Sequence, residues 1–361
     1  MSTADQSPPA GVGGSPWFAV VGPPGSGGEV IARALAALGL GLVESDPSPV
    51  SLEPPVAGER DGATMLSTAG DELLGLLEGT WWAPPDRPTG WEERRELLDA
   101  AIPVVASLET VLRHARCPAA SDDPTRSAAV WYDVRHALLL PFWRARHRGL
   151  RAVVVTWRSP GATVAELAGQ DIRPLHALAL WEMQLVGALA AAEGMPVLGV
   201  DVDAALADPG DWAATAARFV EGLGLAGAGA EVEEVGIELR ASAGRLAIPG
   251  LPPDLEETAS AVRMAGWLAS VAGPHHRWDS PVDLAVGRWA GALLDAQLAG
   301  HRSATSAADA WAAAEGALRD AASAGRDAAS AVDALDWTVD RLVEGWASGR
   351  LTDGGAPTLP D

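Results

Sequence analysis

The sequence contains no lysine and no asparagine, so all 26 of its basic residues are arginines. Without lysine, the protein cannot form the lysine Schiff base of pyridoxal-phosphate enzymes and class I aldolases. It also cannot supply the lysine with which a P-loop contacts the β- and γ-phosphates of a nucleotide. Without asparagine it has no acceptor for N-linked glycosylation. These absences exclude several mechanisms before any motif is considered.

Cysteine and long apolar runs are also scarce. Cys117 is the only cysteine, which excludes an internal disulfide and a cysteine-rich zinc module. No run is long enough to suggest a membrane span, and residues 1–15, rich in Pro, Gly and Ser, lack the regions of a signal peptide. The formal charge of −22 disfavours nucleic acids and anionic membranes as partners. We therefore expect a cytoplasmic protein that binds neither.

Between residues 16 and 225, short apolar runs typical of strands alternate with segments whose apolar residues have helical spacing. This alternation predicts an α/β fold with a parallel sheet covered on both faces. Residues 40–65, rich in Pro, Glu and Ser, indicate a long surface excursion, and no strand is expected after residue 255. We expect strands at 17–21, 127–132, 151–157 and 196–202, and helices from the glycine loop to residue 38 and at 71–77, 92–114, 135–147, 161–169, 176–193 and 211–223.

The composition divides the chain into three parts. Residues 1–15 are expected to form a disordered tail, residues 16–255 the α/β domain, and residues 256–361 a helical C-terminal extension. The extension carries an apolar stripe with alternating spacings of three and four. That stripe predicts a helix packed on its own domain or, alternatively, a seam for a homodimer or a partner protein. Its members are Val332, Leu335, Val339, Leu342 and Trp346.

A glycine loop, Gly22–Gly28 (GPPGSGG), follows the first expected strand and opens a helix. Backbone N–H groups at such a turn, together with the helix dipole, favour an anion. A P-loop ATPase or kinase has Lys and Ser/Thr where this chain has Gly28 and Glu29, so that function is disfavoured. The alternative is a tight turn kept for packing a strand against a helix. The candidate cofactor-binding residues of the loop are Gly22, Gly25, Ser26, Gly27 and Gly28.

A basic segment interrupts the acidic chain between residues 135 and 158, where there are six arginines and no acid. Arg144, Arg146 and Arg148 are expected to complement the dipole at the end of a helix. Arg135 and Arg158 each follow an expected strand, at the edge of the sheet where ligands bind in open α/β folds. A guanidinium there can bind a phosphate through two hydrogen bonds. The sixth member of the segment is Arg151.

Several motifs, taken in order, resemble the sulfotransferases that use 3′-phosphoadenosine 5′-phosphosulfate (PAPS), in particular the bacterial "sulfotransferase family protein" type. The strongest is VWYDVRHALLLPFWR at residues 130–144, which is similar to the family's W-K-D-P-R-x-x-L-x-L-P-F-W-R. Residues 153–160 (VVVTWRSP) are similar to the strand ending in R-x-P that precedes the 3′-phosphate helix. The likeness covers about residues 16–225, including FAVVG at 18–22 and TWWAPP at 80–85.

The resemblance implies a P-loop NTPase-like, three-layer sulfotransferase fold and metal-free sulfuryl transfer from PAPS. The loop would hold the 5′-phosphosulfate, and Arg158 and Arg135 would hold the donor. Asp133, His136 or Glu59 would be the base that accepts the proton of the acceptor hydroxyl. For His136, the alternative is a histidine that faces solvent on the first turn of a helix. Tryptophans 81, 82 and 91 would line an acceptor pocket or, equally, belong to core or lid packing.

This sequence departs from the family pattern at both ends of the donor site. Gly25 replaces the basic residue of the loop, and Glu29 and Glu166 stand where the family has hydroxyl residues. Tyr132 replaces the lysine of the W-K-D-P-R motif. Like charges about 4 Å apart repel by about 4 kcal/mol at an effective dielectric near 20, so carboxylates at both phosphate subsites oppose PAPS.

Two functions therefore remain open. The first is a sulfotransferase-like enzyme of specialised metabolism that transfers a sulfuryl-type group to a hydroxyl or amine of a small molecule. The second is a pseudo-sulfotransferase or repurposed enzyme that does not use PAPS and binds another ligand or a partner protein. The fold favours the first function, whereas the altered donor site favours the second.

Overall fold

The computed structural model describes residues 16–44, 62–85, 98–99, 101–103, 105–106, 109–110, 128–170, 172–225, 232–243, 259–280, 286, 290–303 and 305. The chain divides into two compact units, Met1–Leu294 and Asp295–Asp361. Of the second unit, residues 295–303 and 305 are described and are helical. The expected tail at 1–15, most of the expected helix at 92–114, and the apolar stripe at 332–346 lie outside the described residues.

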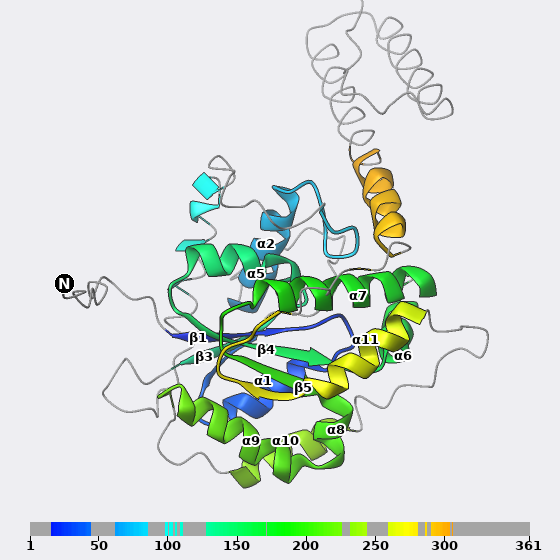
Figure 1. The fold of residues 1–361 in the computed structure, drawn as a ribbon. Coiled ribbons are helices and arrows are strands. Elements are labelled where there is room, and N and C mark those ends of the chain that lie inside the picture. Colours follow the sequence, from blue (N-terminus) through cyan, green and yellow to red (C-terminus); the bar gives the residue numbers. More distant parts are fainter. Residues whose placement is uncertain are drawn as a thin grey trace, which may run out of the picture. The chain divides into compact units, whose positions relative to one another are not determined.

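The first unit is built on a six-stranded sheet in the order β2-β3-β1-β4-β5-β6 (Figure 1). All neighbouring pairs are parallel except β5 and β6, which are antiparallel. The chain is therefore an α/β protein with a mostly parallel sheet, as the alternating pattern predicts. The strands are β1 (Trp17–Val21), β2 (Gly41–Glu44), β3 (Ala129–Tyr132), β4 (Leu150–Trp157), β5 (Val197–Asp201) and β6 (Gly273–His275).

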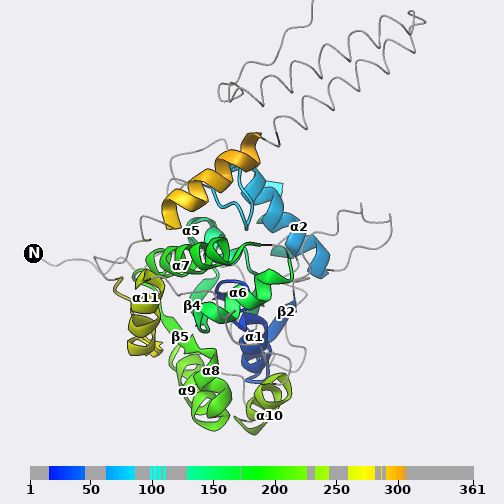
Figure 2. The same cartoon turned by 90° about the vertical axis from the view of Figure 1, so that its right-hand side faces the viewer.

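Helices cover both faces of this sheet (Figures 1 and 2). On one face lie α2 (Gly62–Gly75), α5 (His136–Arg146), α6 (Pro160–Ala168), α7 (Pro174–Ala191) and α11 (Ala259–Ser270). On the other lie α1 (Gly28–Ala36), α8 (Val202–Ala207), α9 (Pro209–Gly222) and α10 (Val232–Ala243). Of the described helices, none is both long and apolar enough to cross a membrane.

Strand β1 shows why the sheet needs two covering layers. All five of its side chains are fully buried, with Trp17, Ala19 and Val21 in one core and Phe18 and Val20 in the other. Successive residues of a strand point to opposite faces, so a continuous apolar run requires apolar neighbours on both. Strands β3 and β4 lie on either side of β1, so the connection from β3 to β4 crosses β1. The end of β1 is thus the topological switch point at which open α/β sheets bind ligands.

Three expectations about the fold are wrong. Residues 41–44 form strand β2 within the predicted surface excursion, and helix α2 begins at Gly62, before the predicted start at residue 71. Strand β6 lies after residue 255, where no strand was expected. Both strands are at the edges of the sheet and are only four and three residues long. Such short edge strands carry no readable alternation, and Pro274 in β6 is tolerated because an edge strand need not donate every ladder hydrogen bond.

The two-sided core yields a stability prediction. Phe18→Ala should lower the free energy of unfolding by about 3–5 kcal/mol, because it opens a cavity in a fully buried part of the sheet. Leu175→Ala is the control, since Leu175 is 52% exposed and its loss should cost less than about 0.5 kcal/mol. Urea denaturation of the two variants measures both values. Equal effects would contradict the burial of β1.

Candidate functional site

The glycine loop connects β1 to α1 and is closely packed. Gly25 has φ +74°, and a Cβ built there would lie 2.9 Å from Cβ of Glu166 on α6. A Cβ built at Gly28 would collide with the ring of Tyr132, at the end of β3. Gly27 is the N-cap of α1 and provides no side-chain cap for the first turn. The loop therefore needs glycine both for its backbone conformation and for the close approach of its neighbours.

Three hydroxyl groups meet beneath the loop. Ser26 Oγ and Thr156 Oγ1 are 3.0 Å apart, and both residues are fully buried. Thr156 Oγ1 also donates to the carbonyl of Val21 at 3.3 Å. Tyr132, the only tyrosine of the chain, shares a side-chain hydrogen bond with Ser26. These hydroxyls bind one another and the backbone, so they hold the loop against β3 and β4.

The surroundings of the loop are negatively charged. Burial raises the pKa of the Tyr132 phenol, and the charges of Asp133, Glu29 and Glu166 raise it further. Glu29 is 46% exposed and pairs with Arg33 one helical turn later, at 3.0 Å. The two carboxylates that the sequence placed at the phosphate subsites thus act electrostatically on the same phenol beside the loop.

Arg158 follows β4 directly, as the sequence predicts, at the edge of the sheet that carries the loop. Its side chain is only 10% exposed, and Nε donates to Oδ1 of Asp203 on α8 at 2.7 Å. A carboxylate of the same chain therefore occupies one side of the guanidinium proposed to bind the 3′-phosphate. Asp203 lies 45 residues away in sequence and was not identified by the motif.

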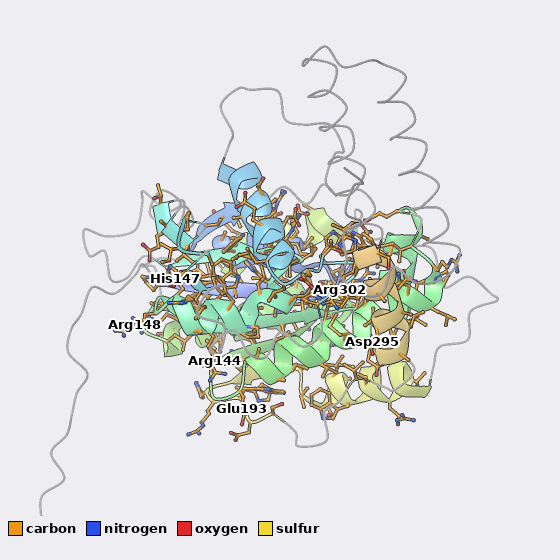
Figure 3. The ribbon with its side chains drawn as sticks, turned by 90° about the horizontal axis from the view of Figure 1, so that it is seen from above. Arg144, His147, Arg148, Glu193, Asp295 and Arg302 are labelled. Carbon is orange, nitrogen blue, oxygen red and sulfur yellow. The ribbon has the colours of Figure 1, made fainter. Side chains whose placement is uncertain are left out.

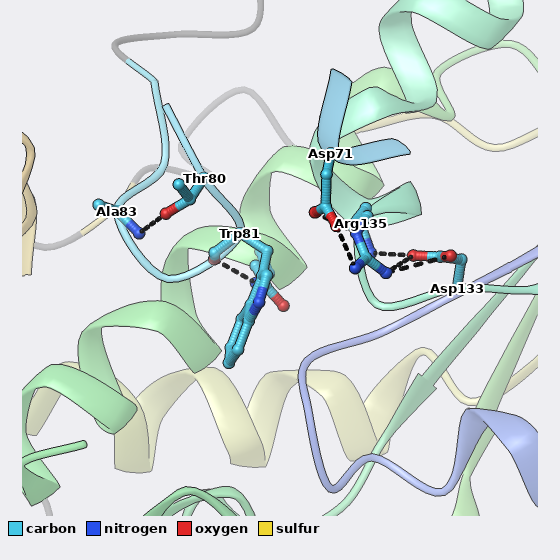
Figure 4. A network of polar contacts seen from close by, with 7 residues as sticks. Asp71, Thr80, Trp81, Ala83, Asp133 and Arg135 are labelled. Atoms are coloured by element: carbon cyan, nitrogen blue, oxygen red, sulfur yellow. Dashed lines mark hydrogen bonds and ion pairs between the residues drawn. The ribbon is translucent and has the colours of Figure 1, made fainter. Parts of the chain in front are cut away.

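Arg135 lies between two carboxylates (Figure 4). Its Nε and Nη2 donate to the two carboxylate oxygens of Asp71 on α2, at 2.6 and 2.8 Å. Its Nη1 donates to Asp133 Oδ1 and Oδ2 at 3.2 and 3.4 Å, and its backbone N–H donates to Asp133 Oδ1 at 2.8 Å. Arg135 is 4% exposed and Asp133 is 3% exposed. We call Asp71, Asp133 and Arg135 the buried charge triad.

The buried charge triad keeps its arginine charged. Burial alone would lower the pKa of Arg135, but the charges of Asp133 and Asp71 and their hydrogen bonds outweigh it, so the pKa is raised. Helix α2 approaches closely because it carries glycine at the contact: a Cβ at Gly70 would lie 2.6 Å from Cδ of Arg135. The sequence identified Arg135 and Asp133, and Asp71 stands in the Asp71-Glu-Leu-Leu segment of the family resemblance, but nothing in the sequence paired Asp71 with Arg135, 64 residues away.

His136 is buried in an aromatic cluster and does not face solvent. It is 1% exposed, its ring centre lies 3.9 Å from that of Trp131, and Nδ1 accepts from Trp143 Nε1 at 3.1 Å. Its Nε2 has no hydrogen-bond partner within the described part of the chain. Burial lowers its pKa to about 4; Asp133 acts in the opposite sense and Arg135 in the same sense. The expectation of a solvent-facing histidine is wrong, because the indoles of the core enclose it.

The turn that carries Trp81 and Trp82 is tied to α7. The carbonyl of Trp81 accepts from Gln184 Nε2 at 3.4 Å, and that of Trp82 bonds to His176 Nε2 at 2.7 Å. Trp81, whose ring Figure 4 shows beside the turn, is 8% exposed and belongs to the core, which favours the packing role of the two that the sequence left open. Trp91 lies outside the described residues.

The remaining predicted base, Glu59, also lies outside the described residues. The structure thus brings together the loop, Tyr132, Thr156 and Glu166, and it separately joins Asp133 to Arg135. No group of three or more His, Cys, Asp or Glu side chains suited to a metal ion occurs among the described residues. Catalytic roles for Asp133, His136 and Glu59 remain predictions.

Comparison with known proteins does not assign this chain to a family. No protein-family model matches this sequence, and no curated protein matches it. The sulfotransferase resemblance rests on the motifs alone and remains a prediction.

The buried charge triad gives a stability prediction. Arg135→Met should lower the free energy of unfolding by about 3–5 kcal/mol, because it leaves Asp133 charged and buried without a partner. Arg33→Met is the control: its pair with Glu29 is one-third to one-half exposed, and its loss should cost less than about 1 kcal/mol. Urea denaturation at pH 7 measures both. A similar, small effect of the two substitutions would contradict the structural role of Arg135.

The buried histidine gives a pH prediction. Because the folded pKa of His136, about 4, lies below its ordinary value of 6.5, the unfolded chain binds the proton more tightly. Its contribution to stability is therefore complete above about pH 6.5 and is lost as the pH falls towards 4, by about 3 kcal/mol. His136→Gln, which keeps an acceptor for Trp143, should reduce this loss, whereas the exposed His276→Gln should not. Unfolding free energies between pH 4 and 7 test it, and identical profiles for all three proteins would contradict it.

Proposed function

We propose that this protein is a pseudo-sulfotransferase: it has a sulfotransferase-like α/β fold, does not use PAPS, and acts by binding. The observation that carries the proposal is the pairing of the strand-end arginines. Arg135 is held by Asp71 and Asp133, and Arg158 is held by Asp203. A donor with phosphate groups would have to compete with these carboxylates for the guanidinium groups.

The charge balance at the loop supports the proposal. PAPS carries negative charge at both its 5′ and 3′ groups, and a site for it must provide positive charge or N–H donors at each. Here Glu29 and Glu166 both act on Tyr132 beside the loop. A unit negative charge about 4 Å from a phosphate costs about 4 kcal/mol at an effective dielectric near 20. One such charge weakens binding by about a thousandfold.

The packing of the loop supports it as well. Tyr132 closely approaches Gly28, and Glu166 closely approaches Gly25, so side chains of the protein pack directly against the turn. Ser26 and Thr156 are fully buried and bonded to each other. These contacts favour the alternative in which the glycines serve the packing of β1, β3 and β4.

A second candidate function is PAPS-dependent sulfuryl transfer to a small-molecule hydroxyl or amine. The observation in its favour is the first turn of α1, which begins at Gly27 without a side-chain cap. Its N–H groups and the helix dipole favour an anion. This function would require Arg158 to leave Asp203 when the donor binds.

Isothermal titration with adenosine 3′,5′-bisphosphate distinguishes the two functions. We expect no binding at about 1 mM ligand, since the arginines are paired and the loop is acidic. Binding with a dissociation constant below about 10 μM that is lost in Arg158→Ala would overturn the proposal in favour of the enzyme.

A gain-of-binding variant makes the negative result informative. The triple change Glu29→Thr, Glu166→Ser and Asp203→Ala removes the opposing carboxylates and the partner of Arg158. It should raise the association constant for the bisphosphate at least about tenfold. Glu221→Thr, Glu233→Ser and Asp279→Ala changes the net charge equally at exposed sites and is the matched control. An equal gain in both triples would contradict a local charge effect.

A further inference from the structure

Four arginines lie where α5 ends and β4 begins. They are therefore near the N-terminal ends of the parallel strands, whereas the glycine loop follows the C-terminal end of β1. Arg144 and Arg146 are in the last turns of α5, Arg148 is in the following turn, and Arg151 is in β4. All four are exposed. Figure 3 shows Arg144 and Arg148 on the same side of the molecule. We call these four residues the arginine patch.

The protein's own structure uses only one of these guanidinium groups. Arg144 Nη1 donates to the carbonyl of Ala191 at 2.8 Å and so caps the end of α7. Across the described ranges, no hydrogen bond or ion pair engages the side chains of Arg146, Arg148 or Arg151. This contrasts with Arg135 and Arg158, which carboxylates of the same chain already hold. The three arginines remain available to an external anion.

Arg151 is exposed at an irregularity in the pairing of β4 with β1. Residues 152–157 of β4 are buried, whereas Arg151 is exposed. Trp17 of β1 pairs with Leu150 and Phe18 pairs with Ala152, so Arg151 has no residue opposite to it. A bulge of this kind redirects a side chain out of the regular ladder. The helix dipole accounts for basic residues in the last turn of α5, but it does not account for an arginine in a bulged central strand.

The chain around the patch is locally basic. Residues 135–158 contain six arginines and no acid, on a protein whose formal charge is −22. Glu109 lies close enough to raise the pKa of His147, which burial lowers. Glu193 lies on the same side of the molecule as Arg144 (Figure 3) but makes no ion pair with the described residues.

We propose that the arginine patch binds a short acidic segment of a partner protein through its Asp and Glu carboxylates. A guanidinium binds a carboxylate with two parallel hydrogen bonds, and three unengaged groups lie within six positions of the chain. The large negative charge repels extended polyanions such as nucleic acids and anionic membranes. A short segment contacts the patch within a Debye length of about 8 Å, where the local positive charge dominates.

This surface is separate from the site behind the proposed function. Strand β4 has eight residues, so its two ends lie about 25 Å apart, with the patch at one end and Arg158 after the other. Binding of an acidic segment here would be compatible with either outcome of the bisphosphate titration.

Fluorescence anisotropy with a labelled peptide of eight glutamates tests the proposal on the full chain. The wild-type protein should bind the peptide at an ionic strength of about 0.02 M and more weakly at about 0.15 M. Arg146→Gln/Arg148→Gln/Arg151→Gln should weaken binding at least about tenfold. The control Arg240→Gln/Arg263→Gln/Arg277→Gln has the same net charge, changes exposed arginines elsewhere, and should stay within about twofold of wild type.

Several results would overturn the proposal. These are equal weakening by the two triple variants, no binding at about 0.02 M ionic strength, or tighter binding of a DNA duplex or phosphatidylserine vesicles than of the peptide. The protein could also dimerise. If the patch variant abolished the dimer, and if dimerisation blocked binding of the peptide, the patch would bind a second copy of the chain instead. If circular dichroism shows that the patch triple is unfolded, the single change Arg151→Gln, compared with Arg263→Gln, should still weaken binding about threefold.

Discussion

A buried guanidinium held by two carboxylates organises much of this structure. Arg135 follows β3, precedes α5, and contacts Asp71 on α2 with the bidentate geometry that makes such pairs strong. Asp133 compensates the charge from the other side. A buried charge is tolerated only when it is paired and hydrogen-bonded, so Arg135 and Asp133, which are both buried, require each other; Asp71, which is 33% exposed, is a second partner for Arg135. The triad thereby fixes α2 to the sheet and removes one cation from the edge where a ligand would bind.

The same constraint recurs around the glycine loop. A chain with no lysine can bring cations to this edge only as arginines, and the described arginines nearest to it are paired: Arg33 with Glu29, and Arg158 with Asp203. At the other ends of the strands the arginines are not paired. Arg146, Arg148 and Arg151 are exposed and unengaged among the described residues. This distribution of paired and unpaired arginines underlies both proposals, of a site that excludes phosphates and of a surface that binds carboxylates.

How much the sequence predicts depends on how local the determining interaction is. The apolar run at β1 and the glycines after it identified a strand, a turn and a helix, since each is determined by neighbouring residues. Asp133 lies two residues from Arg135 in the same motif, whereas Asp71 and Asp203 lie 64 and 45 residues from the arginines that they hold, and no local pattern indicates these two pairings. His136 occupies a first-turn position that is often exposed, but indoles from β1, β3 and α5 enclose it. Charge pairing and aromatic burial across the sheet are tertiary effects, which a motif does not encode.

The protein's own carboxylates hold the two strand-end arginines, and the proposed function requires that they thereby exclude a phosphate donor. Nitrogen-15 NMR of the arginine side chains, with the Arg135 and Arg158 signals assigned through single substitutions, observes these groups directly. We expect both Nε–H signals to exchange slowly with solvent and to stay unchanged when adenosine 3′,5′-bisphosphate is added. A shift of the Arg158 signal that saturates with the bisphosphate would contradict it.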